Sequence, residues 1–222
     1  EALELYKKSR ELNSLNYGPS DLSVACDLED IASALLYLGR FEEAHKTFEK
    51  CLEIQLSQLE ENSVPVARTY IFFAKLFKAQ AMFHQALEKL GKAVQISSKV
   101  ELPPPLVAMC LVSIGECLVG LGEFKQSLEF FNKALPIKIA QNGPDHPDVG
   151  LIRIFMGPPL YKIGKTEEGM KSILEGVEII KKNYGEEHID IAGGYNDLAI
   201  LFKFQGRMNE SIEYFQKALH LY

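Results

Sequence analysis

The sequence lacks closely spaced cysteine pairs, a surplus of basic residues and a long apolar run free of proline. Zinc and redox-active dithiol sites use a CxxC spacing, and no two of the four cysteines are so placed. We therefore expect all four to pack as small apolar residues in a reduced, cytoplasmic compartment. They are Cys26, Cys51, Cys110 and Cys117.

The charge balance excludes another class of function. The formal net charge is -6 with a sequence pI near 5.5, whereas a nucleic-acid-binding protein needs a concentrated basic surface. No signal peptide is apparent, and the most apolar stretch, Leu102 to Gly115, is short and carries three prolines at its start. We expect it to be too short for a membrane span.

A repeated pattern is present instead. Five segments contain a small residue, an apolar residue two positions later and a second small residue three positions after that. The first residues of the five, called anchors here, are Gly39, Ala81, Gly122, Gly164 and Gly206, at successive steps of 42, 41, 42 and 42 residues. Such a constant period indicates a repeat architecture.

Each repeat has the pattern of a helical hairpin. Apolar residues precede the anchor at helical spacing, as in Leu28, Ile31, Leu35 and Leu38. The anchor falls at a turn, where a missing Cβ permits a tight reversal, and a second amphipathic helix follows. Stacked hairpins would bury the apolar surface that one hairpin leaves exposed.

These positions resemble those of the tetratricopeptide repeat (TPR). The period of about 42 residues and the linkers Gly143-Pro144-Asp145-His146-Pro147 and Gly185-Glu186-Glu187-His188-Ile189 are similar to the kinesin light chain subclass. The resemblance implies an all-α, right-handed superhelical solenoid of about five and a half hairpins in one array. The predicted boundaries are a half repeat at 1–16 and repeats at 22–58, 64–99, 105–141, 147–183 and 189–222.

The fourth repeat departs from the pattern. Pro158 and Pro159 fall inside its expected first helix, where a proline costs about 3 kcal/mol through a lost hydrogen bond and a ring clash. Gly157, Gly169 and Gly176 would loosen this repeat further. Two interpretations stay open: a degenerate, kinked repeat, or a functional feature, either a hinge or a widened groove that admits a ligand.

The resemblance implies that the first helices line a concave groove. Lys75 and Lys78, three residues apart, should share a helix face and make a basic patch beside apolar residues. That patch would suit a protein or peptide with acidic residues around an apolar anchor. The predicted groove residues are Arg68, Ile71, Lys75, Lys78, Met109, Val112, Glu116, Ile154, Tyr161, Asn196, Ile200 and Lys203.

These patterns favour a scaffold or adaptor that binds a protein or peptide in this groove. The alternative is a regulatory module that masks a catalytic or DNA-binding domain elsewhere in a longer protein. Neither catalytic residues nor a cofactor or metal site is indicated, so we do not expect an enzyme. Kinesin light chain repeats tend to carry an L-N-N-L-A segment in their first helix. Only Tyr195-Asn196-Asp197-Leu198-Ala199 approaches it here, which argues against cargo recognition of the kinesin type.

Overall fold

In the computed structural model, which describes residues 1–222, the chain consists of eleven α-helices and contains no β-strand. The predicted all-α class is therefore confirmed. The helices are α1 (Ala2–Tyr17), α2 (Leu22–Tyr37), α3 (Phe41–Gln58), α4 (Val64–Ala79), α5 (Phe83–Ser97), α6 (Pro104–Leu121), α7 (Phe124–Asn142), α8 (Pro147–Lys162), α9 (Thr166–Tyr184), α10 (Ile189–Phe204) and α11 (Met208–Leu221).

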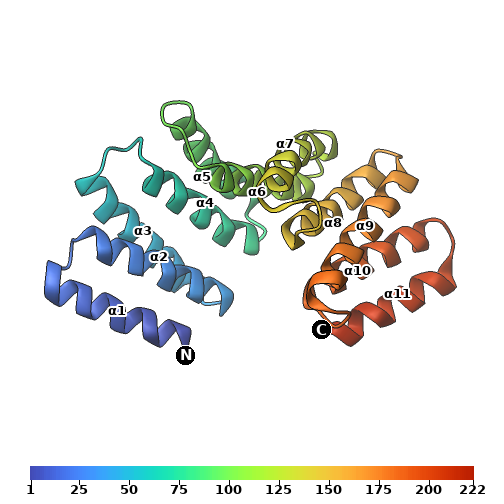
Figure 1. The fold of residues 1–222 in the computed structure, drawn as a ribbon, viewed down its shortest axis with the longest axis horizontal. Helices are drawn as coiled ribbons and strands as arrows, with labels where there is room; N and C mark the ends of the chain where they lie inside the picture. The colour runs from blue at the N-terminus through green and yellow to red at the C-terminus, as the bar shows by residue number, and fades with distance from the viewer. The chain divides into compact units, whose positions relative to one another are not determined.

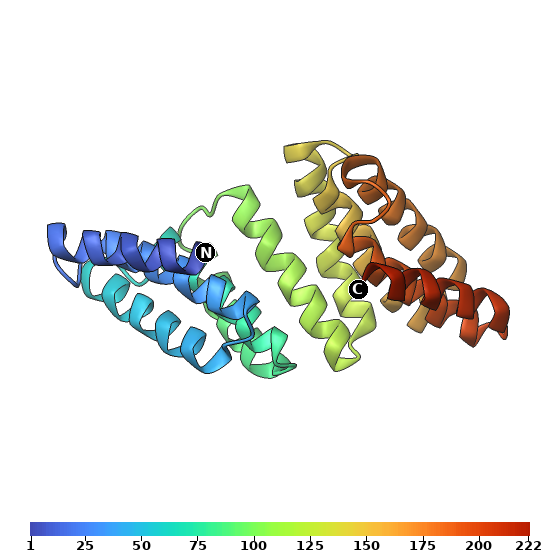
Figure 2. The same cartoon turned by 90° about the horizontal axis from the view of Figure 1, so that it is seen from below.

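The helices form two compact units, Glu1–Leu106 and Val107–Tyr222. In the first unit, consecutive helices from α1 to α5 pack on one another (Figure 1). In the second, α8 packs on α9 and α10 on α11 as two hairpins, and α9 also contacts α10 (Figure 2). The prediction of one continuous array concerns how the two units stack, and it stays a prediction.

Turns within the hairpins lie at the five anchors. Gly39, Gly122, Gly164 and Gly206 have φ angles of 71°, 82°, 88° and 75°. These angles fall in the left-handed region, which glycine enters without steric cost. Ala81 takes the same role with φ 56° and is the one non-glycine residue of the chain with a positive φ. The repeat therefore imposes this backbone shape even where the sequence lacks a glycine.

The linkers between repeats end in side-chain caps. Nδ1 of His146 accepts a hydrogen bond from the backbone N–H of Asp148 at 3.2 Å, and Nδ1 of His188 accepts one from Asp190 at 3.3 Å. Asp21 caps α2 through the N–H of Ser23 at 2.8 Å. Each cap satisfies a backbone donor that the first turn of a helix leaves unpaired. The equivalent linker histidines are thus helix caps, consistent with a structural role.

The two helices of a hairpin cross closely at the second small position of each repeat. Ala44, Ala86 and Ser127 are fully buried there, and Ser211 is 3% exposed. The hydroxyl of Ser211 donates to the carbonyl oxygen of Ala199 at 2.8 Å, which ties α11 to α10. A larger side chain at these sites would push the helices apart.

In the fourth hairpin, α8 and α9 approach each other so closely that a Cβ atom would clash with the facing backbone. A Cβ at Gly176 would lie 2.4 Å from the carbonyl oxygen of Gly150, and a Cβ at Gly169 would lie 2.8 Å from that of Gly157. The two pairs are seven residues apart on both α8 and α9. The interpretation that these glycines loosen the repeat is wrong, because they allow the two backbones to touch.

Pro158 and Pro159 lie within α8, which continues past them to Lys162. Because proline has no N–H, the carbonyl groups of Ile154 and Phe155 receive no intrahelical bond from them. The turns that precede the prolines lie against α9 through Gly150 and Gly157. Whether this repeat acts as a hinge stays a prediction.

Helix α6 (Pro104–Leu121) extends beyond Gly115, where the apolar stretch noted in the sequence ends. It runs for 18 residues, and by length and composition alone it could cross a membrane. Of these residues 44% are buried within the protein, and a core helix has the same composition. Its Leu111, Val112 and Val119 pack against a buried cluster around Phe131 and Ile152.

The cysteines differ in their surroundings. Cys51, Cys110 and Cys117 are buried, as expected, whereas Cys26 is exposed, so the packing prediction is wrong for that residue. Burial raises the pKa of the Cys51 and Cys110 thiols to about 12. These two thiols therefore stay protonated and inert at neutral pH.

Replacing Ala81 with glycine should stabilise the protein. The left-handed conformation costs an L-residue about 1–2 kcal/mol, and the greater freedom of glycine in the unfolded chain offsets about half of that. We expect Ala81→Gly to raise the free energy of unfolding by roughly 0.5–1 kcal/mol in urea titrations. Gly39→Ala, at an equivalent turn, should have the opposite sign. An equal loss from both variants would contradict this account.

Gly176→Ala should destabilise the protein by about 1–3 kcal/mol, the usual cost of overpacking. The new methyl group would meet the backbone of Gly150. Gly193→Ala is the matched control, because a Cβ at Gly193 meets nothing within 4 Å and alanine favours a helix interior by about 0.5–1 kcal/mol. Thermal unfolding of both variants measures the difference. A neutral Gly176→Ala would show that the helices can separate at no cost.

Candidate functional site

The predicted groove residues of the first unit differ in accessibility. Arg68, Lys75 and Lys78 on α4 are partly accessible, whereas Ile71 is fully buried. Because Ile71 is covered by the protein, a partner cannot contact it. The prediction that Ile71 lines the binding groove is therefore wrong. Lys75 Nζ lies 4.7 Å from the ring centroid of Phe72, which places a cation and an aromatic ring side by side on α4.

A buried polar network lies beneath this surface. The hydroxyl of Thr69 lies 2.7 Å from Oε2 of Glu29 and 3.0 Å from Oε1 of Gln55. Nε of Arg68 lies 2.8 Å from Oε1 of Glu29, whose side chain is 7% exposed. Burial raises the pKa of Glu29, and the Thr69 hydrogen bond and the Arg68 charge oppose that rise. Arg68 therefore holds a carboxylate between α2 and α4 as well as facing solvent.

The predicted residues of the second unit divide in the same way. Ile154 on α8 is 3% exposed and belongs to a core cluster with Ile173 and Val177 of α9. The prediction that Ile154 lines the groove is therefore also wrong. Tyr161, Asn196 and Ile200 are partly accessible, and Lys203 is exposed. On α6, Met109, Val112 and Glu116 are partly accessible as well.

The sequence prediction missed an aromatic pair at the ends of α8 and α10. The rings of Tyr161 and Phe204 lie 5.3 Å apart, and the side chain of Phe204 is 60% exposed. Nζ of Lys162 lies 5.5 Å from the Tyr161 ring centroid and 5.2 Å from that of Phe204. Two first helices thus present an accessible aromatic surface that carries a cation.

Asp197 is a second residue that the prediction missed. It is partly buried on α10, and burial raises the pKa of its carboxyl group to about 7. Its carboxyl group forms neither a hydrogen bond nor an ion pair within the protein. Its position in the Asn196-Asp197 segment was a signal in the sequence, because paired polar residues interrupt an otherwise apolar helix there.

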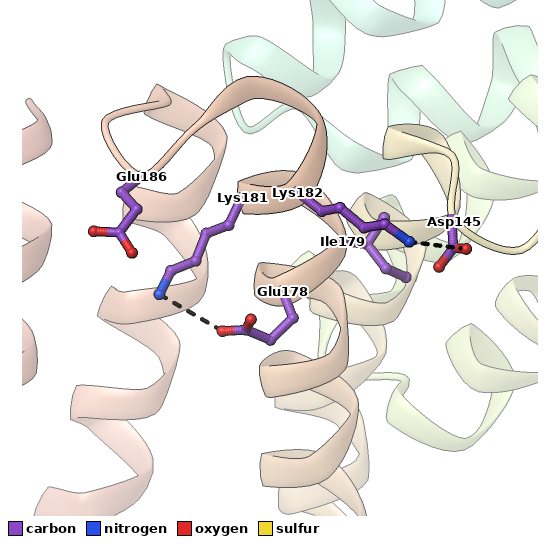
Figure 3. A pocket seen from close by; sticks show the side chains of 6 residues that line it. All are labelled: Asp145, Glu178, Ile179, Lys181, Lys182 and Glu186. Atoms are coloured by element: carbon purple, nitrogen blue, oxygen red, sulfur yellow. Dashed lines mark hydrogen bonds and ion pairs between the residues drawn. The ribbon is translucent and has the colours of Figure 1, made fainter.

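A cleft of about 590 Å³ lies near the linker ends of α8, α9 and α10. Figure 3 shows Lys182 reaching Asp145 and Lys181 facing Glu178, at 3.2 Å and 3.6 Å. Glu186 adds a further negative charge, so the lysines are balanced by carboxylates. In addition, Asn183 Nδ2 donates to the carbonyl oxygen of Asp145 at 2.8 Å. These contacts fasten the linker to α9, and we assign the cleft a structural role.

Comparison with known proteins agrees with the hairpin geometry. Family models described as "Tetratricopeptide repeat" match residues 1–57 and 192–222. Tetratricopeptide repeats are therefore present at these two segments of the chain. Protein KINESIN LIGHT CHAIN-RELATED 1 of Arabidopsis thaliana is 25% identical over 99% of this chain and 36% of its own length. The chain thus spans about a third of this curated relative.

Solved TPR-like structures show the same fold. BtubC (BKLC) from P. vanneervenii has a TM-score of 0.76 at 14% identity, over 99% of this chain and 89% of its own. TPR-like repeats of a kinesin light chain-like protein of Podospora anserina have a TM-score of 0.69 at 18% identity, over 90% and 96%. A Rap protein complexed with competence and sporulation factor has a TM-score of 0.71 at 14% identity, over 99% and 64%.

The raised pKa of Asp197 predicts that the effect of this residue on the free energy of unfolding depends on pH. An acid whose pKa is higher in the folded state binds more protons there, so its stabilising effect is present at low pH and is lost as pH rises towards about 7. We expect Asp197→Asn to raise the free energy of unfolding at pH 8 by on the order of 2 kcal/mol, allowing for solvent access.

At pH 4 the same substitution should change that free energy little, because the carboxyl group is protonated in the folded protein. Parallel denaturation of the parent and Asp197→Asn at both pH values isolates this group from the other acids. Equal differences at the two pH values would show that the carboxyl group titrates normally.

Proposed function

We propose that this chain is a protein-interaction scaffold that binds a peptide segment of a partner on its first helices. The observation that carries the proposal is the grouping of charged and aromatic side chains on those helices. Phe72, Lys75 and Lys78 group on α4, and Tyr161, Ile200 and Phe204 on α8 and α10. Accessible aromatic rings beside charges are typical of the residues that dominate binding energy in interfaces.

The chemistry of α4 favours acidic residues around an apolar anchor in the partner. Lys78 follows Lys75 by three residues, and Phe72 precedes it by three, so Lys75 neighbours both on the helix surface. A carboxylate of the partner would meet the ammonium groups, and an apolar side chain would meet the ring. Charge complementarity of this kind raises the association rate and sets the register of binding.

Structural relatives support a peptide as the ligand. The Rap protein described above was solved in complex with competence and sporulation factor. YrrB, another TPR protein with a TM-score of 0.52 to this chain, is described as having an unusual peptide-binding site. Extended segments suit such repeats because each helix adds one more strip of contact surface.

A regulatory module within a longer protein is the second candidate. Aspartyl phosphate phosphatase F of Bacillus subtilis has the same fold over 99% of this chain, which covers 64% of that protein. A fold of this type is therefore combined there with further sequence. Under this alternative, the ligand of the first helices would be a neighbouring domain of the same polypeptide.

Reversing the charge of the α4 patch should abolish partner binding. We expect Lys75→Glu/Lys78→Glu to lose the proteins that the parent chain captures from cell lysate, as identified by mass spectrometry. Peptides covering an identified partner then define the bound segment, whose affinity we expect to fall at least about tenfold in the variant. Circular dichroism establishes that the variant is folded.

Lys46→Glu/Lys50→Glu is the matched control. Both lysines are exposed on α3, and the double substitution changes the net charge by the same amount away from the patch. Loss of the partner in both double variants would indicate a general effect of charge. Retention in both would place the binding site elsewhere.

A further inference from the structure

Asp197 lies on an open stripe of α10. Gly193, Asp197, Ile200 and Phe204 follow one another at steps of four, three and four residues, so they lie along one face of the helix. A Cβ at Gly193 would meet nothing within 4 Å. The absent side chain therefore leaves free space one turn from the carboxylate.

The opposite face of α10 is sealed. Ile191, Leu198 and Leu201 are at most 2% exposed and join the core of the second unit. Gly194 faces α9, since a Cβ there would lie 2.6 Å from Cγ2 of Val177. A group that satisfies Asp197 from outside must therefore approach along the open stripe.

The carboxylate of Asp197 has no partner within the protein, yet it keeps access to solvent. Neither oxygen of Asp197 is among the fully enclosed side-chain atoms that lack a hydrogen-bond partner. A partly desolvated anion without a cation is costly. A positively charged ligand group would remove that cost.

An aromatic surface that already carries a cation lies at the end of the same stripe. Phe204 is seven residues beyond Asp197, and Tyr161 of α8 packs on it at 5.3 Å. The chain's own Lys162 already places its ammonium group 5.2 Å from the Phe204 ring centroid. Lys162 is exposed, so the side chain of a ligand can displace it from the rings.

We propose that Asp197, Phe204 and Tyr161 form a subsite for a basic side chain, arginine above all, of a bound peptide. The guanidinium group would pair with the carboxylate of Asp197, and its aliphatic stem would lie along Ile200 towards the rings. A planar guanidinium suits this place because it can donate two hydrogen bonds to a carboxylate, while its apolar stem packs on the aromatic rings.

This subsite rests on the proposed function only in that the ligand is a peptide. It lies in the second unit and does not involve the basic patch of α4. The two proposals therefore fail separately: the lysate experiment tests Lys75 and Lys78, and the experiment below tests Asp197 with a defined probe. Together they would give the partner an acidic segment and a basic one.

The test is a titration of the ¹⁵N-labelled chain with the capped tripeptide acetyl-Ala-Arg-Ala-amide at pH 8, where Asp197 is ionised. We expect saturable shifts of the backbone amide signals around Asp197, Phe204 and Tyr161. The same peptide with citrulline, the neutral isostere of arginine, should cause no saturable shift there. Equal shifts with both peptides would overturn the proposal.

Three variants sharpen this test. Asp197→Asn should weaken the arginine peptide at least about tenfold, the value of one charged hydrogen-bonded contact. Glu187→Gln, an exposed acid on the linker, should leave the affinity within about twofold and controls for net charge. Lys162→Gln should strengthen binding, because it removes the competing cation.

Equal weakening by Asp197→Asn and Glu187→Gln would mean that the peptide responds only to the acidic protein as a whole. Weaker binding to Lys162→Gln would show that the bound side chain does not take the place of Lys162 on the aromatic rings. Either result would contradict the subsite, and neither would bear on the α4 patch.

Discussion

The close contact between the two helices of each hairpin is the constraint on which the rest of this structure depends. At that contact the chain places the small residues Ala44, Ala86, Ser127, Gly169 and Ser211. Because these residues are small, the larger apolar residues on either side can interlock. The helices then stand at a fixed separation, and their outer faces carry charged and aromatic groups to defined positions.

The sequence was sufficient to predict this framework. The anchors repeat at a constant period, and turn conformation depends on one residue at a time, so Gly39 or Gly164 identifies a turn without any knowledge of distant contacts. The linker histidines could likewise be recognised, because His146 and His188 bond to the backbone only two residues away. Local chemistry of this kind is read directly from sequence.

The functional surface could be predicted only in part, because it depends on contacts between distant segments. Ile71 and Ile154 align with Asn196 in their repeats, but neighbouring helices cover the two isoleucines and leave the asparagine accessible. The aromatic pair of Tyr161 and Phe204 joins residues 43 positions apart. The fourth repeat shows the same limit, since a glycine that looks flexible in a sequence can mark the tightest contact in a fold.

The glycine pairs of α8 and α9 also bear on how this protein can evolve. Repeat proteins commonly diversify by exchange or duplication of whole hairpins, which works when any first helix fits any second helix. Gly150 and Gly157 fit only a partner with glycine at both matching heights, and the other second helices carry alanine or serine at one or both. The fourth hairpin must therefore be inherited as a single piece, so recombination within it would be selected against while recombination at its linkers would not.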